Sequence, residues 1–215
     1  FMLKTGRLYG LESNSLVEER FDPVKSTWAA VRYLKELYNI YKDWNLVLAA
    51  FNSGPGNVNK AIRRAGGSTD YWDIYPFLPK ETRGYVPGFI AANYVMTYYC
   101  EHGICPMESE LPAISDTIHI NRDLHFQQVA NVCNIDIEQL RSLNPQFKKD
   151  IVPGNSRVYA LRLPNNTVNT FIERQDSIYA YDTKKFLPKR RTVAVNDGTS
   201  TNGKGAKYHK IKSGE

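Results

Sequence analysis

The 215-residue chain is 42% hydrophobic and 12% aromatic, which excludes an intrinsically disordered protein and allows one or two packed domains. It contains no apolar run of about 18 residues, so the sequence predicts no membrane-spanning helix. The net charge of +6 resides in residues 184–215, where nine Lys and Arg face only Asp197 and Glu215, and the near-neutral remainder argues against a nucleic-acid-binding core.

Residues 1–105 are predicted to be helical. Asp22-Pro23 marks a helix start, with Asp as the cap and Pro at the first helical position. Apolar residues then recur at three- and four-residue steps, which predicts a helix of about five turns with its buried face along this stripe. The stripe consists of Trp28, Val31, Leu34, Tyr38 and Tyr41.

Three further helices are expected in this part of the chain. The first covers residues 44–51, is apolar almost all round and is therefore expected at the centre of the domain. The second covers residues 57–64, and the third runs from near Pro87 to Gly103, where glycine ends it. Between them, residues 72–78 are aromatic-rich and are expected to be irregular.

The hydrophobic period changes after a short Pro-bounded linker at residues 106–115. A strand at 117–120, helices at 126–132 and 136–143, and a strand at 158–164 form a strand–helix–helix–strand unit over residues 116–164. Phe171-Ile172 and residues 178–181 are strand-like, which predicts a strand-rich extension at 165–187. Residues 188–207 are expected to be a basic, flexible linker, with loose attraction to an anionic surface as an alternative to simple solvation.

Two interpretations of the cysteines remain open. Cys100 and Cys105 are close enough in sequence to close a small loop by a disulfide in an oxidising compartment, or they are two free, half-buried thiols at a helix end. Cys133 lies in an apolar helical pattern and is expected in the core. A metal site on Cys100, His102 and Cys105 would lack a fourth ligand, so we expect neither a metal nor a cofactor.

The most informative motif is A-x-N-x-G-x-G-x-V, which occupies residues 50–58 at the end of the central apolar helix. It occurs in order with Thr5-Gly6-Arg7-Leu8-Tyr9-Gly10-Leu11, with residues 22–27 and with residues 78–86. In this order and spacing, the motifs resemble the membrane-bound lytic murein transglycosylase D family. The resemblance implies a mainly α fold, in which residues 1–105 form a lysozyme-like helical domain that is incomplete at its start.

Members of this family cleave the bond between N-acetylmuramic acid and N-acetylglucosamine in peptidoglycan and form a 1,6-anhydro sugar. One glutamic acid acts first as general acid and then as base, which requires a raised pKa in a partly apolar cleft. In the family this residue lies in a Glu-Ser motif ahead of the groove motif, so we expect it upstream of Phe1. None of the glutamates weighed as a substitute is expected to act as the acid, and we expect this polypeptide alone to be inactive. These are Glu12, Glu18, Glu19, Glu36 and Glu81.

The resemblance assigns glycan binding to Asn52, Ser53, Gly54, Gly56 and Tyr85. Asn52 would hydrogen-bond the glycan or fix the groove loop, the glycines would let the backbone approach the sugar, and Tyr85 would lie beside the catalytic glutamate. Considered singly, each residue has a simpler interpretation. Asn52 could end a helix, the glycines could form a turn, and Tyr85 could be a core aromatic.

The strand–helix–helix–strand unit resembles a LysM module, a fold that binds glycans containing N-acetylglucosamine. The resemblance rests on residues 118–120, 129–130, 135–140, 143–145 and 151–154. It implies a glycan loop, although residues 122–126 depart from the usual Ser-Gly-Asp-Thr-Leu, and a LysM-shaped spacer is the alternative. The loop comprises Asp123, Leu124, His125, Asn144 and Pro145. Residues 208–215 resemble the start of a further LysM-like repeat, or else they are a stray tail.

We therefore expect a periplasmic protein of the cell envelope that binds peptidoglycan glycan strands, binds no nucleic acid, and derives from a membrane-anchored lipoprotein. A non-catalytic peptidoglycan-binding scaffold is the alternative. Because the helix that carries the glutamate would cover the central helix, the apolar residues at 44–51 are expected to be exposed or covered by a partner. This predicts either a dimer contact at that face or marginal stability.

Overall fold

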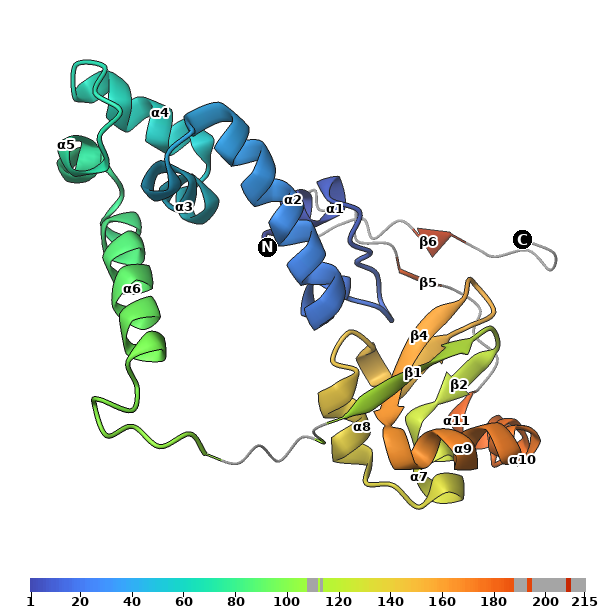
Figure 1. Cartoon of the computed structure of the whole chain (residues 1–215). Coiled ribbons are helices and arrows are strands. Elements are labelled where there is room, and N and C mark those ends of the chain that lie inside the picture. Colours follow the sequence, from blue (N-terminus) through green and yellow to red (C-terminus); the bar gives the residue numbers. More distant parts are fainter. Residues whose placement is uncertain (108–111, 113, 188–192, 195–207, 210–215) are drawn as a thin grey trace. The chain divides into compact units, whose positions relative to one another are not determined.

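Figure 1 shows a computed structural model that describes residues 1–107, 112, 114–187, 193–194 and 208–209. The chain divides into two compact units, one made of residues 1–27 and 109–215 and the other of residues 28–108. Each unit has its own hydrophobic cluster. The sequence analysis placed residues 1–105 in one domain, whereas by contacts the first 27 residues belong with the C-terminal part.

The unit of residues 28–108 is helical, as predicted. Helix α2 spans Pro23–Tyr41, α3 Trp44–Ser53, α4 Pro55–Arg64, α5 Tyr71–Ile74 and α6 Lys80–Thr97, with a 3-10 turn η2 at Tyr75–Phe77. The side chain of Asp22 accepts hydrogen bonds from the backbone N–H groups of Val24 and Lys25 at 3.0 Å, so it caps α2 as predicted. Asp43 caps α3 in the same way.

Helix α3 forms the centre of this unit. Leu46, Val47, Ala49 and Ala50 are fully buried among α4, α6 and the residues of α5. The prediction of a bare apolar face over residues 44–51 is therefore wrong for these side chains, because helices within the same unit cover them. The expectation of a dimer through that face loses its physical basis. The exposed large hydrophobic residues of α6 are Tyr85, Phe89, Ile90, Tyr94, Val95 and Met96.

The buried face of α2 differs from the predicted stripe at its start. Leu34, Tyr38 and Tyr41 pack against the cluster as expected, but Trp28 is 62% exposed and Val31 47% exposed. Each three-residue step turns an α-helix by about 300°, so two such steps carry Trp28 about 120° away from Leu34. The three-residue spacing therefore drifts off the buried face.

Helix α6 begins at Lys80, seven residues before the predicted start, and contains Pro87 in its interior. A proline has no N–H for the carbonyl four residues earlier, which belongs to Arg83. The hydroxyl of Tyr71 donates to that carbonyl oxygen at 3.3 Å. The helix tolerates the proline because a side chain from α5 replaces the missing donor. The helix also ends at Thr97 rather than at Gly103.

The strand–helix–helix–strand prediction is confirmed in the other unit. Strand β1, Ser115–Ile120, pairs antiparallel with β4, Tyr159–Pro164, and the helices α7, Phe126–Cys133, and α8, Ile137–Leu143, lie between them in sequence. A second short pair joins β2, Asp123–His125, to β3, Ile151–Pro153. Gly154 follows β3 at a close backbone approach, where a Cβ atom would lie 2.3 Å from the carbonyl oxygen of Arg122.

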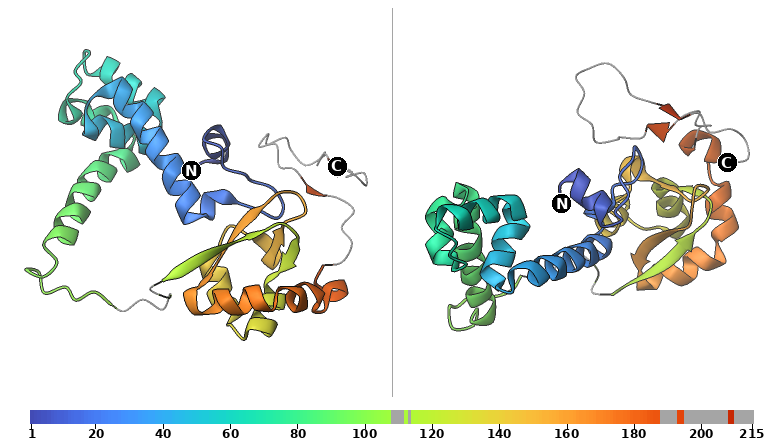
Figure 2. Two further views of the ribbon diagram at one scale, coloured as in Figure 1. Left: turned by 45° about the vertical axis from the view of Figure 1, so that its right-hand side comes forward. Right: turned by 90° about the horizontal axis from the view of Figure 1, so that it is seen from above.

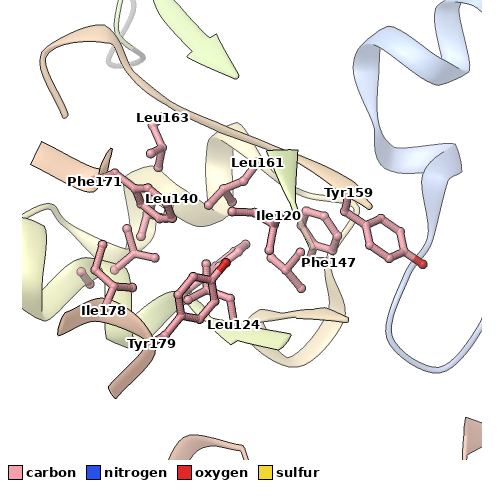
Figure 3. Close-up of a cluster of buried hydrophobic side chains, with 14 of the residues drawn as sticks. Ile120, Leu124, Leu140, Phe147, Tyr159, Leu161, Leu163, Phe171, Ile178 and Tyr179 are labelled. Carbon is pink, nitrogen blue, oxygen red and sulfur yellow. The ribbon is translucent and has the colours of Figure 1, made fainter. Parts of the chain in front are cut away.

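The predicted strand-rich extension at 165–187 is wrong, because these residues form helices. They are α9, Asn165–Glu173, α10, Gln175–Ala180, and α11, Thr183–Phe186. Phe171 lies in α9 and Ile178 in α10, and each helix presents its residue to the core, where both are buried with Tyr179 (Figure 3). Figure 2 shows α9 and α10, in orange, along one side of the β1–β4 ribbon.

The N-terminal residues complete the same unit. Helix α1, Leu3–Leu8, and a 3-10 turn η1, Glu19–Phe21, flank an extended stretch in which Leu16 and Val17 join the hydrophobic cluster. Val17 forms an antiparallel bridge with Phe147.

Cys133 is half-buried and packs against the same cluster as expected, and burial raises the pKa of its thiol.

Several sequence-based expectations concern other features of the chain. Cys100 and Cys105 are free thiols, but both are exposed rather than half-buried, and α6 ends at Thr97, before either of them. No helix in the described ranges has the length and apolar character needed to cross a membrane. Residues 188–192, 195–207 and 210–215 lie outside the described residues. The flexible linker at 188–207 and the further LysM-like repeat at 208–215 therefore stay predictions. Val193–Ala194 (β5) and Tyr208–His209 (β6) pair antiparallel.

Candidate functional site

The candidate groove residue Asn52 lies in the last turn of α3, where α6 packs against it (Figure 1). The hydroxyl of Thr82 donates to Asn52 Oδ1 at 2.9 Å, and Thr82 itself is only 1% exposed. On the other side of the amide, Asn52 Nδ2 makes a long contact of 3.5 Å with Glu81 Oε1. The Asn52 side chain is therefore held at the junction of two helices, with one edge of the amide half-exposed.

Glu81 and Tyr85 lie one helical turn apart on the exposed side of α6. Glu81 is in the first turn, where a carboxylate interacts favourably with the helix dipole. Tyr85 is 37% exposed, so the interpretation of Tyr85 as a core aromatic does not hold. The two side chains extend the polar surface that begins at Asn52.

The loop between α3 and α4 has the backbone expected of the glycine motif. Gly54 has a φ of 84° and ends α3, a conformation that favours glycine over any other residue. Gly56 meets no atom within 4 Å of an added Cβ, so the space in front of it is open. Ser53 turns inward and donates to the carbonyl of Ala49 at 2.9 Å. Tyr41 braces the loop by donating to the Pro55 carbonyl at 3.1 Å.

Sequence reasoning missed the two partners of the Asn52 amide. Thr82 lies 30 residues further along the chain, and it was quoted only as part of a family motif. Glu81 was considered only as one of the glutamates that are not expected to act as the acid. The adjacent pair Glu81-Thr82 could have indicated a binding position for an amide side chain. Thr82 supplies a donor for the amide oxygen and Glu81 an acceptor for the amide nitrogen, and both lie at the start of one helix.

Two of the predicted LysM-loop residues are inside the fold. Leu124 is fully buried in the hydrophobic cluster. Asn144 is also fully buried, and its side chain braces α8 against β4. Its Nδ2 donates to the carbonyls of Leu140 at 3.0 Å and Arg162 at 2.8 Å, and its Oδ1 accepts from the Arg162 N–H at 2.8 Å. These contacts leave no edge of the Asn144 amide for a ligand.

The other three residues of that loop are accessible to different degrees. Asp123 is half-buried and accepts from the Asn155 N–H at 3.0 Å. His125 caps α7, where its Nδ1 accepts from the Gln127 N–H at 3.0 Å. Pro145 is exposed. Asp123 and His125 are tied to the fold, and Pro145 alone among the five is freely exposed.

The C-terminal helices cover part of this loop. The His125 and Phe186 rings lie with their centroids 5.0 Å apart. Gln128, which is fully buried, donates to the Tyr181 carbonyl at 2.9 Å, and Asn131 donates to the Tyr181 hydroxyl at 3.0 Å. The residues from 175 to 187 therefore restrict access to His125 from one side.

Two open cavities occur in the unit of residues 1–27 and 109–215. One of about 480 Å³ is lined by amide and apolar side chains that include Asn134, Gln139 and Ile114. The other, of about 490 Å³, lies between Arg7 and Arg157. Neither is lined by Asn52 or by the predicted LysM loop. Among the described residues, no group of His, Cys, Asp and Glu could hold a metal ion.

Two family models match two different stretches of this sequence. A family model described as the transglycosylase SLT domain matches residues 1–74, and one described as the LysM-like domain of lytic transglycosylase MltD matches residues 115–180. The second match includes α9 and α10. It therefore assigns these helices to the LysM-like domain, as their packing does.

Two curated proteins are similar over a longer stretch. Both are called membrane-bound lytic murein transglycosylase D, one from Escherichia coli strain K12 and one from Escherichia coli O6:H1. Each is 32% identical over 162 residues, which is 73% of this chain and 35% of the relative. The chain thus spans about a third of the length of these relatives.

Proposed function

The chain belongs to the family of membrane-bound lytic murein transglycosylase D, and on this premise we propose that it forms part of an enzyme that cleaves peptidoglycan. The bond is the one between N-acetylmuramic acid and N-acetylglucosamine, and the product carries a 1,6-anhydro sugar. In this proposal the helical residues supply the floor of the glycan groove, and the general acid comes from outside the 215 residues.

The arrangement at Asn52 carries this proposal. Its amide is fixed by Thr82 next to an open glycine loop, so it can donate to a sugar without first losing side-chain freedom. Tyr85, on the same polar surface, would steady charge that develops beside the acid. Ser53 acts through its backbone in this scheme, because its hydroxyl is turned inward.

The glutamates of the chain support the proposal that it is inactive by itself. A Glu-Ser pair does occur at Glu12-Ser13, but the Glu12 carboxylate is ion-paired with Arg157 and accepts from the Tyr159 hydroxyl at 3.0 Å. The Glu12 carboxylate is thus engaged by side chains of the fold, whereas the general acid has to face the scissile bond in an open cleft. Glu81 lies beside Asn52 but is exposed rather than set in an apolar cleft.

Digestion of purified peptidoglycan sacculi tests the catalytic part. We expect no 1,6-anhydro-muropeptides by liquid chromatography and mass spectrometry after incubation with the 215-residue chain. Their release would refute the proposed inactivity. If the Glu81→Gln variant then abolished that release, Glu81 would be identified as the acid.

Co-sedimentation with the same sacculi tests the groove. Loss of one hydrogen bond in Asn52→Ala is expected to weaken binding about 2- to 10-fold. The matched control is Asn39→Ala, which removes an exposed amide from α2 and is expected to leave binding unchanged. Equal affinity of both variants and the parent chain would contradict a glycan groove at Asn52.

The LysM-like domain is proposed as a second glycan contact, through Asp123, His125 and Pro145. Leu124 and Asn144 would shape this loop from inside rather than touch sugar, since both are buried. A Pro145→Ala change in the Asn52→Ala background should lower sacculus binding further. No additional loss would favour the LysM-shaped spacer.

We also propose a periplasmic, envelope-associated location for the parent protein. The relatives are called membrane-bound in their names, and that word supports an anchored parent. The competing function is a non-catalytic peptidoglycan scaffold. A parent protein that binds sacculi and releases no anhydro product would favour the scaffold.

A further inference from the structure

Residues 12–22, called here the acidic segment, bring four carboxylates into the unit that holds the LysM-like domain. They are Glu12, Glu18, Glu19 and Asp22. The last three are almost fully buried, and Asp22 is only 1% exposed. Buried carboxylates are costly unless they are paired and hydrogen-bonded, so their partners reveal what the segment is built to contact.

Glu18 and Glu19 pair locally with Arg20 and Lys25, but each of the three buried carboxylates also has a cationic partner more than 120 residues further along the chain. Asp22 Oδ1 accepts from Arg162 Nη2 at 2.8 Å, and the Arg162 side chain is itself largely buried. Glu19 is 2.5 Å from Arg157, and Glu18 is 3.4 Å from Lys148. Three carboxylates therefore meet three cations of the LysM-like domain.

Backbone and apolar contacts follow the same line. The Lys148 N–H donates to the Leu16 carbonyl at 2.6 Å, and the Glu18 N–H donates to the Gln146 carbonyl at 2.8 Å. Between them, Val17 is fully buried and bridges to Phe147. The segment thus adds a short antiparallel strand to the domain and inserts two side chains into its core.

The ionic state of the contact is stable over the physiological pH range. Burial opposes ionisation of Glu18, but hydrogen bonds from Arg20 and Ser13, together with the charges of Arg20 and Lys148, lower its pKa to about 2. The carboxylate therefore stays charged at every pH from mildly acidic upward. The ion pairs of Glu18 therefore persist over this pH range.

We propose that residues 146–148, Arg157 and Arg162 form a docking surface for the acidic segment, which holds the LysM-like domain to residues 1–27 as a non-covalent clasp. The segment lies within the residues matched by the SLT domain, and the docking surface lies within those matched by the LysM-like domain. The clasp therefore joins the first residues matched by the SLT domain to residues matched by the LysM-like domain, in addition to the chain connection through residues 106–114. The clasp is independent of glycan binding and of catalysis.

Cleavage of the connection tests the clasp in the full chain. A protease recognition sequence is placed over residues 108–111, the folded protein is cut there, and the products are run on size-exclusion chromatography at micromolar concentration. We expect the two fragments to co-elute as one species of the original size. Elution as two separate fragments would overturn the proposal.

Two variants of the cut protein locate the contact. Arg162→Ala leaves the buried Asp22 carboxylate without its cation and is expected to weaken fragment association by about 100-fold or more. Val17→Asp attacks the apolar part independently and should separate the fragments as well. Arg141→Ala is the matched control, because it removes an arginine whose ion pairs to Glu138 and Asp150 lie outside the clasp. Co-elution that survives both test variants would show that a different surface holds the fragments.

Discussion

Asn144 offers the sharpest test of what the LysM-like loop does, because the sequence and the structure give it different roles. The resemblance to LysM modules assigns it to the glycan loop. In the structure it is fully buried and makes three hydrogen bonds to the backbone of Leu140 and Arg162. We predict that Asn144→Ala destabilises the domain and affects glycan binding only through that loss of stability.

The expected magnitude follows from the groups left behind. The substitution removes the partner of the Arg162 N–H and of the Arg162 carbonyl, and each buried group without a partner costs about 1–3 kcal/mol. Arg162 is half-buried, so water can reach part of this site, and we expect a total of about 2–4 kcal/mol. Asn144→Asp should be at least as damaging, since a carboxylate would face two carbonyl oxygens.

Hydrogen exchange by mass spectrometry resolves this change within the chain. Exchange of the β1 and β4 amides should accelerate about 30- to 1000-fold, the factor that corresponds to 2–4 kcal/mol. All three tryptophans, at positions 28, 44 and 72, lie in the other compact unit. Their fluorescence transition in urea should therefore stay unchanged. Pro145→Ala, at the exposed neighbouring position, serves as the control.

One result would refute this reasoning. If Asn144→Ala left β1 and β4 exchange unchanged but lowered sacculus binding, the side chain would be a glycan ligand and the bracing role would be wrong.

Three further predictions concern stability. Gly154→Ala should cost about 1–3 kcal/mol by overpacking, seen as faster exchange at β2 and β3, because its Cβ would lie 2.3 Å from a backbone oxygen. Tyr71→Phe should cost about 0.5–1.5 kcal/mol of stability, measured by urea unfolding followed by tryptophan fluorescence, because the Arg83 carbonyl loses its donor. Adding Pro87→Ala should recover most of this loss, because alanine restores the backbone N–H that proline lacks. If the effects of the two substitutions were simply additive in the double variant, this coupling would be contradicted. The folded pKa of Glu18 is about 2, below the ordinary value of 4.5, so its contribution to stability, on the order of 3 kcal/mol, is present above pH 4.5 and disappears as the pH falls towards 2. Glu18→Gln should flatten the stability curve over that range, and an unchanged curve would show that another carboxylate dominates.

Local patterns predicted much of the fold. The cap at Asp22-Pro23, the apolar helix predicted at 44–51 and the strand–helix–helix–strand unit were all accessible from spacing and capping residues. The extension at 165–187 was not, because two adjacent apolar residues such as Phe171 and Ile172 fit a strand as well as a helix. Phe171 and Ile178 belong to two successive short helices, so no single helical period runs through the extension, and both residues pack against the same core.

The remaining errors share a physical cause, which is a partner distant in sequence. Pro87 predicts a helix start, but in the structure it lies inside a helix, because the Tyr71 hydroxyl donates the hydrogen bond that the proline cannot. The contacts of the acidic segment with Lys148, Arg157 and Arg162 were not predicted, since these cations lie more than 120 residues away in the sequence. Thr82, likewise, becomes a partner of Asn52 only when α3 and α6 pack together.

The contacts of the Asn52 amide also determine which replacement is tolerated there. Thr82 donates to its oxygen, while the Glu81 carboxylate can only accept and lies on the side of its nitrogen. The two neighbours thus distinguish the two ends of a group that is almost symmetric in shape. Aspartate, the closest match to asparagine in size, would set a second carboxylate against Glu81. At this position the isosteric substitution is the least conservative one, and a smaller neutral residue would disturb the groove less.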